Sequence, residues 1–385
     1  MPITTSDFRK IRNDNACYID KTSYMVNLTM YETQSQYFLS RPRKFGKSLL
    51  ISTLKYLFKG DKDLFRGLYI YDKHNWEIIY SVIHLDFSAL SKKGPSELEA
   101  SFIREFREIR FIDFKIDLEK INYEIVDKEY SCTEICFWFK RLIHFSKNDG
   151  RLIALLIDEY DKPITDHITN ITFAEQMQDV LRTFFDCVKS VENDIRFLFV
   201  TGVTKFSQSH MFSSLNNLID LTFSEEYCSL AGFTHDEIIN NLMTPIKNIV
   251  KHRRREANDQ IPEEVVFNKT MDEMKDYYDG YRFSVMEENL YSPSAVRNFL
   301  RFKKHTAFED KTPQVKYAFE LFPKFHQTEF PIHGQNVSVS KLKSISKLGD
   351  LKLLNILYDT GIFTIKRYDA KTETFFLHFP NKKVE

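Results

Sequence analysis

The 385-residue sequence contains little glycine and little proline, with 11 residues of each. This scarcity disfavours a loop-rich fold and indicates helices and buried strands. The formal net charge is zero, with 54 basic and 54 acidic residues, so no global field attracts the protein to nucleic acid or to an anionic membrane. Any such contact would have to come from a local basic patch.

Apolar segments that could span a bilayer or direct secretion are also lacking. No apolar run is long enough to cross a membrane. Residues 1–14 are polar and lack the apolar core of a signal peptide. The five cysteines are scattered and odd in number, so we expect reduced thiols in a cytoplasmic protein. Cys132 and Cys136 are four residues apart, but no cysteine or histidine follows them at a spacing typical of a metal site.

Residues 36–58 contain the most informative pattern of the chain. A short apolar run suited to a buried strand leads into a polar turn, and Gly46-Lys47-Ser48 then opens an amphipathic helix. A strand, a tight loop and Gly-Lys-Ser at a helix start form the context of a phosphate-binding P-loop. Gly46 would let the backbone approach a phosphate, Lys47 would bridge the β- and γ-phosphates, and Ser48 would offer its hydroxyl to Mg²⁺.

One departure from the usual P-loop weakens this interpretation. The first glycine of the motif, five residues before the second, is replaced by Arg41. Gly-Lys-Ser is also common by chance, so a plain strand-to-helix turn with a surface lysine stays an alternative. The N–H groups of Lys47, Ser48 and Leu49 would still form the start of a helix, where unpaired donors favour an anion.

A second apolar run, residues 152–157, is typical of a strand buried on both faces. It ends in Asp158 and Glu159, and an Asp-Glu pair at the carboxyl end of such a strand is the Walker B arrangement. Asp158 would hold the Mg²⁺ ion of a bound ATP, and Glu159 would polarise the attacking water. Two solvated acids after a core strand are the alternative, but the order of the two motifs favours an ATP site.

A third apolar run, residues 195–200, ends in a polar segment. Thr201 is the first candidate for a residue that senses the γ-phosphate and Thr204 the second, and a simple turn that caps the strand is the alternative. Residues 218–223 predict a further short strand. Strands separated by helices over about residues 30–230 indicate an α/β parallel sheet, with the phosphate site at the carboxyl ends of its strands.

Helical patterns dominate the next part of the chain, which opens with a predicted capping box of Thr234 and Glu237. The basic run 251–255 is a candidate phosphate-binding patch, although a solvated helix end is the simpler interpretation. The aromatic turn 277–283 either serves packing alone or presents Arg282 to a nucleotide.

The tail predicts a helix over 348–359 and two strands over 362–367 and 374–379. Helices followed by a two-stranded wing resemble a winged helix. Its hairpin carries few basic residues, so we expect any DNA binding to be weak and the tail to pack mainly on the helices before it. We therefore expect three domains, an α/β core over 1–231, a helical lid over 232–305 and a winged-helix-like region over 306–385.

Ten stretches, taken in order, resemble those of the bacterial AAA-ATPase-like proteins. They are SDFRKIR, YIDKT, RPRKFGKSLLISTL, VIHLDFS, LLIDEYDKPI, VTGVTKFS, GFT, YYDGYRFS, LYSPSAVRNFL and LYDTGIFTI. The resemblance covers nearly the whole chain, from about residue 5 to residue 380. In that family Arg-Pro-Arg, here residues 41–43, normally precedes Phe-Gly-Lys-Ser, here residues 45–48. The missing first glycine is therefore a family trait.

The resemblance implies a P-loop NTPase core of the AAA+/STAND kind, followed by a helical lid and a winged-helix region. It also implies a PD-(D/E)XK nuclease-like domain that would begin just after residues 379–381. Because the sequence ends at Glu385, we expect no nuclease activity from this chain. A nuclease-like domain or another protein is a candidate partner, homo-oligomer formation stays open, and no membrane contact is expected.

The leading hypothesis is a Mg²⁺-dependent ATPase, and the alternative is a nucleotide-switched module that binds DNA or protein with little turnover. Glu159 favours hydrolysis, whereas a DNA-binding regulator with an inert core is disfavoured by the zero net charge. Arg41, Arg43 or Arg282 would add positive charge in the transition state. The predicted site has Lys47, Glu159 and Thr201 as catalytic residues, Arg43, Phe45, Gly46, Lys47, Ser48, Leu49, Asp158 and Arg282 as nucleotide contacts, and Ser48 and Asp158 as metal ligands.

Overall fold

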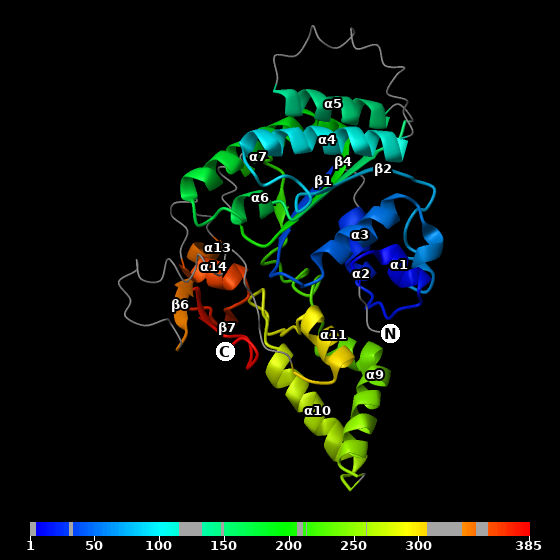
Figure 1. Ribbon diagram of the computed structural model, residues 1–385, viewed down its shortest axis with the longest axis vertical. Coiled ribbons are helices and arrows are strands. Elements are labelled where there is room, and N and C mark those ends of the chain that lie inside the picture. The colour runs from blue at the N-terminus through cyan, green and yellow to red at the C-terminus, as the bar shows by residue number, and fades with distance from the viewer. Residues whose placement is uncertain are drawn as a thin grey trace.

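The computed structural model describes residues 5–30, 34–114, 133–147, 150–205, 211–212, 214–258, 260–305, 333–343 and 353–385. They form a parallel sheet with helices on both faces, a helical part, and a small antiparallel sheet near the C-terminus (Figure 1). The first residues of the predicted helix over 348–359 lie outside the described residues.

The parallel sheet has five strands in the order β2-β3-β4-β1-β5. The strands are β1 (Ser35–Ser40), β2 (Ser81–Asp86), β3 (Ile153–Asp158), β4 (Ile195–Gly202) and β5 (Ile219–Asp220). All of the pairings are parallel, so the carboxyl ends of the strands meet at one edge of the sheet. Because β4 lies between β1 and β3, the predicted P-loop and the predicted Walker B acids leave the same edge one strand apart.

The two faces of this sheet are covered by different helices, as Figure 1 shows. Alternate side chains of β3 face opposite ways, so Leu155 joins one apolar cluster and Leu156 the other. This burial on both faces explains the continuous apolar runs in the sequence. The helices on the first face are α4 (Pro95–Phe114), α5 (Glu134–Lys147) and α7 (Ile171–Ser190), and those on the second are α1 (Phe8–Asn13), α2 (Thr22–Thr29) and α3 (Lys47–Phe58).

The fifth strand is shorter than the predicted strand over 218–223, since only Ile219 and Asp220 pair with β1. The reason is a turn in which the N–H of Thr222 donates to the side chain of Asp220 at 2.9 Å. The hydroxyl of Thr222 then accepts from the backbone N–H of Ser40 at 3.0 Å, so a side chain replaces the sheet ladder there.

The helical part consists of α9 (His235–Glu256), α10 (Glu263–Tyr278) and α11 (Pro293–Phe302), which share a separate apolar cluster. The predicted capping box of Thr234 and Glu237 starts α9. The basic run forms the last turn of α9, where Arg253 pairs with Glu273 at 2.8 Å. These neighbours agree with the simpler interpretation of that run as a helix end.

The C-terminal part contains α13 (Val339–Lys343), α14 (Leu353–Asp359) and a three-stranded antiparallel sheet in the order β6-β8-β7. The predicted hairpin corresponds to β7 (Thr364–Asp369) and β8 (Thr374–His378). The expectation of only two strands was wrong, because β6 (Gln335–Ser338) pairs with β8. The sequence of β6, Gln-Asn-Val-Ser, lacks the apolar alternation that would have identified it.

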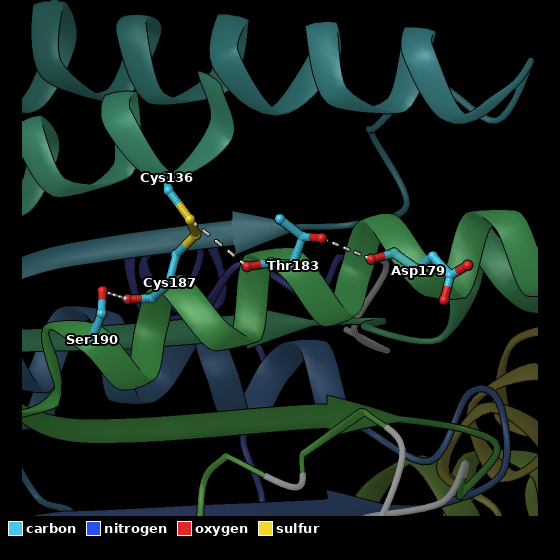
Figure 2. The surroundings of a disulfide bond; sticks show 5 residues. All are labelled: Cys136, Asp179, Thr183, Cys187 and Ser190. Atoms are coloured by element: carbon cyan, nitrogen blue, oxygen red, sulfur yellow. Dashed lines mark hydrogen bonds between the residues drawn. A yellow bond between two sulfur atoms is a disulfide. The ribbon is translucent and has the colours of Figure 1, made fainter. Parts of the chain in front are cut away.

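The expectation that all cysteines are reduced thiols was also wrong. Cys136 of α5 and Cys187 of α7 form a disulfide, with Cα atoms 5.3 Å apart (Figure 2). The two positions are 51 residues apart, and only the packing of α5 on α7 brings them together. Cys17 and Cys228 are free, and Cys132 lies outside the described residues. None of the described helices is both long and apolar enough to cross a membrane.

Candidate functional site

A cavity of about 390 Å³ lies between the P-loop and α11 of the helical part. Of the predicted site, it brings together Phe45, Gly46, Lys47, Ser48, Leu49 and Glu159. The N-terminal lead contributes Ile19 and Lys21, and α11 contributes Val296 and Arg297. The cavity therefore has polar groups at the P-loop and apolar walls between the N-terminal segment and α11.

The P-loop contains two residues with left-handed backbone. Gly46 has φ 98° and precedes the first residue of α3, and Lys44 has φ 64°. A Cβ at Gly46 would have no atom within 4 Å, so glycine is required there by conformation and not by lack of space. The first residues of α3 line the cavity, and a helix start is a favourable place for an anion.

Lys47 is 5% exposed and points back along its own loop. Its ammonium donates to the carbonyls of Arg41 at 2.8 Å and Pro42 at 3.0 Å. Burial lowers the pKa of Lys47, and the charges of Asp158 and two further acids oppose that effect. The P-loop lysine thus lies within electrostatic reach of the acids that follow β3.

Asp158 and Thr201 form a buried pair at the carboxyl ends of β3 and β4. The hydroxyl of Thr201 donates to Oδ1 of Asp158 at 2.5 Å, and the backbone N–H of Glu159 donates to the same oxygen at 3.0 Å. Thr201 is fully buried and is not among the residues that line the cavity. The structure therefore places Thr201 as a partner of Asp158, and not beside the space where a γ-phosphate would lie.

The second threonine candidate, Thr204, also serves the acidic segment. Its backbone N–H donates to Oδ2 of Asp161 at 2.7 Å, and its carbonyl accepts from the Tyr160 hydroxyl at 2.8 Å. Burial raises the pKa of Asp161. Asp161 is thus occupied in holding the loop after β4.

Glu159 is half-buried, lines the cavity and has φ 50°. A left-handed backbone is unfavourable for a residue other than glycine and persists only where the surrounding structure enforces it. Burial raises the pKa of Glu159, and the nearby charge of Asp161 adds to this effect. Strain and a raised carboxyl pKa at a cavity wall are typical of a functional residue.

The three arginines proposed for transition-state charge have different surroundings. Arg41 is 1% exposed and donates to carbonyls of residues 40, 222, 227 and 228. Arg282 donates to the carbonyls of Ser284, at 3.1 Å, and Val285. Both side chains donate to carbonyls inside the protein, although Nε of Arg41 has no acceptor, and neither lines the cavity. The structure therefore does not bring them to the site.

Arg43 does not line the cavity either, but its surroundings differ from those of the other two arginines. It is half-buried, and its charge lowers the pKa of Glu159 as one of the smaller effects on that group. Within the described ranges, its guanidinium has no hydrogen-bond partner. Arg43 therefore stays a candidate for contact with a nucleotide.

Two cations of the cavity were missed in the sequence. Arg297 of α11 lines the cavity from the lid. Lys21 donates to the carbonyl of Ser229 at 2.7 Å and to Glu237 of the α9 capping box at 2.7 Å. Both lie in stretches that carry the family resemblance, Arg297 in LYSPSAVRNFL and Lys21 in YIDKT. Neither belongs to a motif whose spacing would have identified it as a site residue.

The strand order, the Gly-Lys-Ser loop before α3 and the acids after β3 define a P-loop NTPase fold. A sequence model for the family described as "Predicted AAA-ATPase" matches residues 2–212. This match covers more than half of the chain, and the chain belongs to the AAA-ATPase-like family. The match ends before the lid and the C-terminal sheet.

Two further similarities were found. The chain is 28% identical over 390 residues to the "Uncharacterized protein in vnfD 5'region" of Azotobacter chroococcum mcd 1, with 100% of this chain and 68% of that protein covered. The solved structure of the Aeropyrum pernix ORC1 protein in complex with DNA aligns with a TM-score of 0.32 and 7% identity, covering 94% of this chain and 89% of that one. A TM-score this low defines neither the fold nor the function of this chain.

Proposed function

We propose that the protein binds ATP with Mg²⁺ in this cavity and hydrolyses it. The observation that carries the proposal is that Lys47, Ser48 and Glu159 line one cavity at the start of α3. These are the groups that phosphoryl transfer to water needs for phosphate charge, metal and water. Membership of the AAA-ATPase-like family supports the same activity.

The residues fit a magnesium ion that arrives with the nucleotide. In the part of the chain that the structure describes, no group of three or more His, Cys, Asp or Glu side chains could hold a metal alone. Mg²⁺ in nucleotide sites usually takes one or two protein ligands together with phosphates and waters. Ser48, which lines the cavity, would supply one, and Asp158, which is 3% exposed and is not among the lining residues, would supply the other. A bound Mg²⁺ would neutralise phosphate charge and orient the γ-phosphate.

The remaining roles follow from position. Lys47 would exchange its two carbonyl acceptors for phosphate oxygens, and Glu159 would orient and polarise the attacking water. Thr201 would hold Asp158 in place through the hydrogen bond of 2.5 Å that its hydroxyl donates. Arg43 from the loop and Arg297 from the lid would add positive charge around the phosphates.

Glu159→Gln tests whether the site hydrolyses ATP. The amide keeps the shape of the side chain but cannot polarise water, so we expect normal ATP affinity and turnover lower by about a hundredfold or more. Steady-state phosphate release and equilibrium binding of a fluorescent ATP analogue with Mg²⁺ measure the two quantities separately. Glu105→Gln, at another glutamate whose pKa is raised by burial, is the matched control and should leave turnover unchanged.

Three results would change the proposal. Equal turnover in Glu159→Gln and the wild type would assign water activation to another group. Nucleotide binding without turnover in the wild type would favour the nucleotide-switched module. The absence of any nucleotide binding by the wild type would reject the proposed function.

A further inference from the structure

Arg41 occupies the place of the first glycine of a usual P-loop, and its side chain explains what the larger residue does there. The guanidinium leaves the loop on the side away from the cavity and donates to carbonyls of Thr222 and Cys228 at 2.9 and 3.1 Å. Burial lowers the pKa of Arg41 to about 10, so the group stays charged at neutral pH. Arg41 thus stabilises the loop through hydrogen bonds made away from the cavity lining.

The P-loop also contacts residues that come after the family match and that do not line the cavity. The guanidinium of Arg41 lies 4.3 Å from the centre of the Phe283 ring. The ring of Phe45 contacts those of Tyr281 and Phe283, with centroids 4.8 and 5.4 Å apart. Gly361 also packs so closely on the loop that an added Cβ would lie 2.9 Å from Cβ of Pro42.

The residues that make these contacts are connected to the residues of the loop that line the cavity. The carbonyl of Arg41 is an acceptor for the ammonium of Lys47, at 2.8 Å. Lys44, which follows, holds a left-handed conformation that needs support from its surroundings, whereas Gly46 adopts one that glycine permits. Fixing Arg41 and Phe45 therefore fixes the segment that presents Lys47 and the first N–H groups of α3.

We propose that Phe283 is a positioning residue for the nucleotide site and that it acts through Arg41 to preorganise the phosphate loop. The inference rests on the proposed function, because it concerns the affinity of the same site for ATP. Preorganisation removes part of the ordering that binding would otherwise require, so it raises affinity without a contact to the ligand. Arg41 therefore supplies an anchor in this loop, and not transition-state charge.

Phe283→Ala tests the inference in the full chain, with binding of a fluorescent ATP analogue and Mg²⁺ as the measurement. We expect the Kd to rise about tenfold, as the loss of a buried cation–π contact and its packing would produce. Turnover at saturating ATP should stay within about twofold of the wild type, because no group at the reacting phosphate changes.

Phe376→Ala is the matched control. Phe376 also pairs with an arginine, since Arg367 lies 5.6 Å from its ring centre, but this pair belongs to the antiparallel sheet. A general loosening of the C-terminal part would raise the Kd in both variants, whereas the inference requires an effect of Phe283→Ala alone. Thermal unfolding of both variants shows whether they are folded at the temperature of the assay.

The double variant Arg41→Lys with Phe283→Ala tests whether Phe283 acts through Arg41 or independently of it. Lysine keeps the charge of Arg41 but loses the planar group that covers the ring. We expect Arg41→Lys to raise the Kd and Phe283→Ala to add little in its presence. Additive effects, or an unchanged Kd in Phe283→Ala while the wild type binds ATP, would overturn the inference. A wild type that binds no ATP would instead reject the proposed function.

Discussion

The parallel sheet and the segments that follow it in the chain contact the P-loop with different kinds of residue. The parallel sheet ends at the cavity and supplies acids and hydroxyls, of which Asp158 and Thr201 form the central pair. The segment between α10 and α11 and the turn between α14 and β7 contact the loop with aromatic rings and a glycine, such as Phe283 and Gly361. Chemistry and positioning are thus divided between parts of the chain that are far apart in sequence.

We expect the largest effect on ATP affinity from Lys47→Ala, which removes the positive charge that the P-loop contributes to the cavity. We expect ATP affinity to fall about a hundredfold, as the loss of strong charged hydrogen bonds to phosphate would produce. Because Lys47 also bonds two loop carbonyls, unfolding by heat should be measured alongside binding of the fluorescent analogue. Unchanged affinity in this variant would contradict the P-loop assignment.

Lys59→Ala is the control for the loss of a lysine near α3. Lys59 is the C-terminal cap residue of that helix, at the end away from the cavity. This variant should bind ATP as the wild type does. A similar loss in both variants would point to a general effect of charge and not to contact with phosphate.

The parallel sheet could be predicted from sequence because burial on both faces leaves a strong signal. Residues 153–158 are all buried, and the predicted run 152–157 differs from that strand by one residue at each end. The antiparallel sheet is half exposed, and β6 has too little apolar character to be recognised. Its place in the sheet depends on pairing with β8 across a long stretch of chain, which local patterns do not contain.

For the candidate site, sequence motifs located the residues but did not determine the direction of their side chains. The Gly-Lys-Ser motif and Glu159 line one cavity. Thr201 and Arg282 were expected beside the nucleotide, but each finds its partners inside the protein. A hydroxyl or a guanidinium bonds to whichever acceptor the tertiary fold brings near, and residue type alone does not specify that acceptor.

Asp359 connects α14 to the end of the parallel sheet. It belongs to α14, and its side chain accepts from the backbone N–H of Lys205, just after β4, at 3.3 Å. Burial raises its pKa from 3.8 to about 7, with the charge of Lys205 opposing and those of Asp161 and Asp220 adding to the rise. Between these values the folded protein binds a proton that the unfolded chain has lost. This group therefore stabilises the fold most at low pH, and the contribution is lost as the pH rises toward 7.

We expect Asp359→Asn to remove that dependence. Relative to the variant, the wild type should lose stability on the order of a few kcal/mol between about pH 4 and pH 7. Unfolding by denaturant at a series of pH values measures the difference in free energy. Parallel curves for the two proteins would show that the pKa of Asp359 is the same in the folded and unfolded states, and this would contradict the prediction.

The smallest effect is expected for the basic residues of the antiparallel sheet, Lys366, Arg367 and Lys371. Lys366 donates to the carbonyl of Pro380 at 2.6 Å, and Arg367 covers the ring of Phe376. The segment after β8 binds the lid, where the backbone N–H of Lys382 donates to the carbonyl of Asp276 at 3.0 Å. These contacts favour packing on the lid over contact with a DNA backbone.

Reversal of these three charges should therefore change DNA binding very little. Three cations can neutralise few phosphates, so affinity for duplex DNA should be weak and its logarithm should fall with the logarithm of salt with a slope no steeper than about −3. Fluorescence anisotropy over a salt titration measures this slope. Reversal of Lys251, Arg254 and Arg255, in the basic end of α9, is the control for a general effect of charge. Tight binding at physiological salt that is lost only when the charges of the antiparallel sheet are reversed would make that sheet a DNA-binding surface and contradict its role as a packing element.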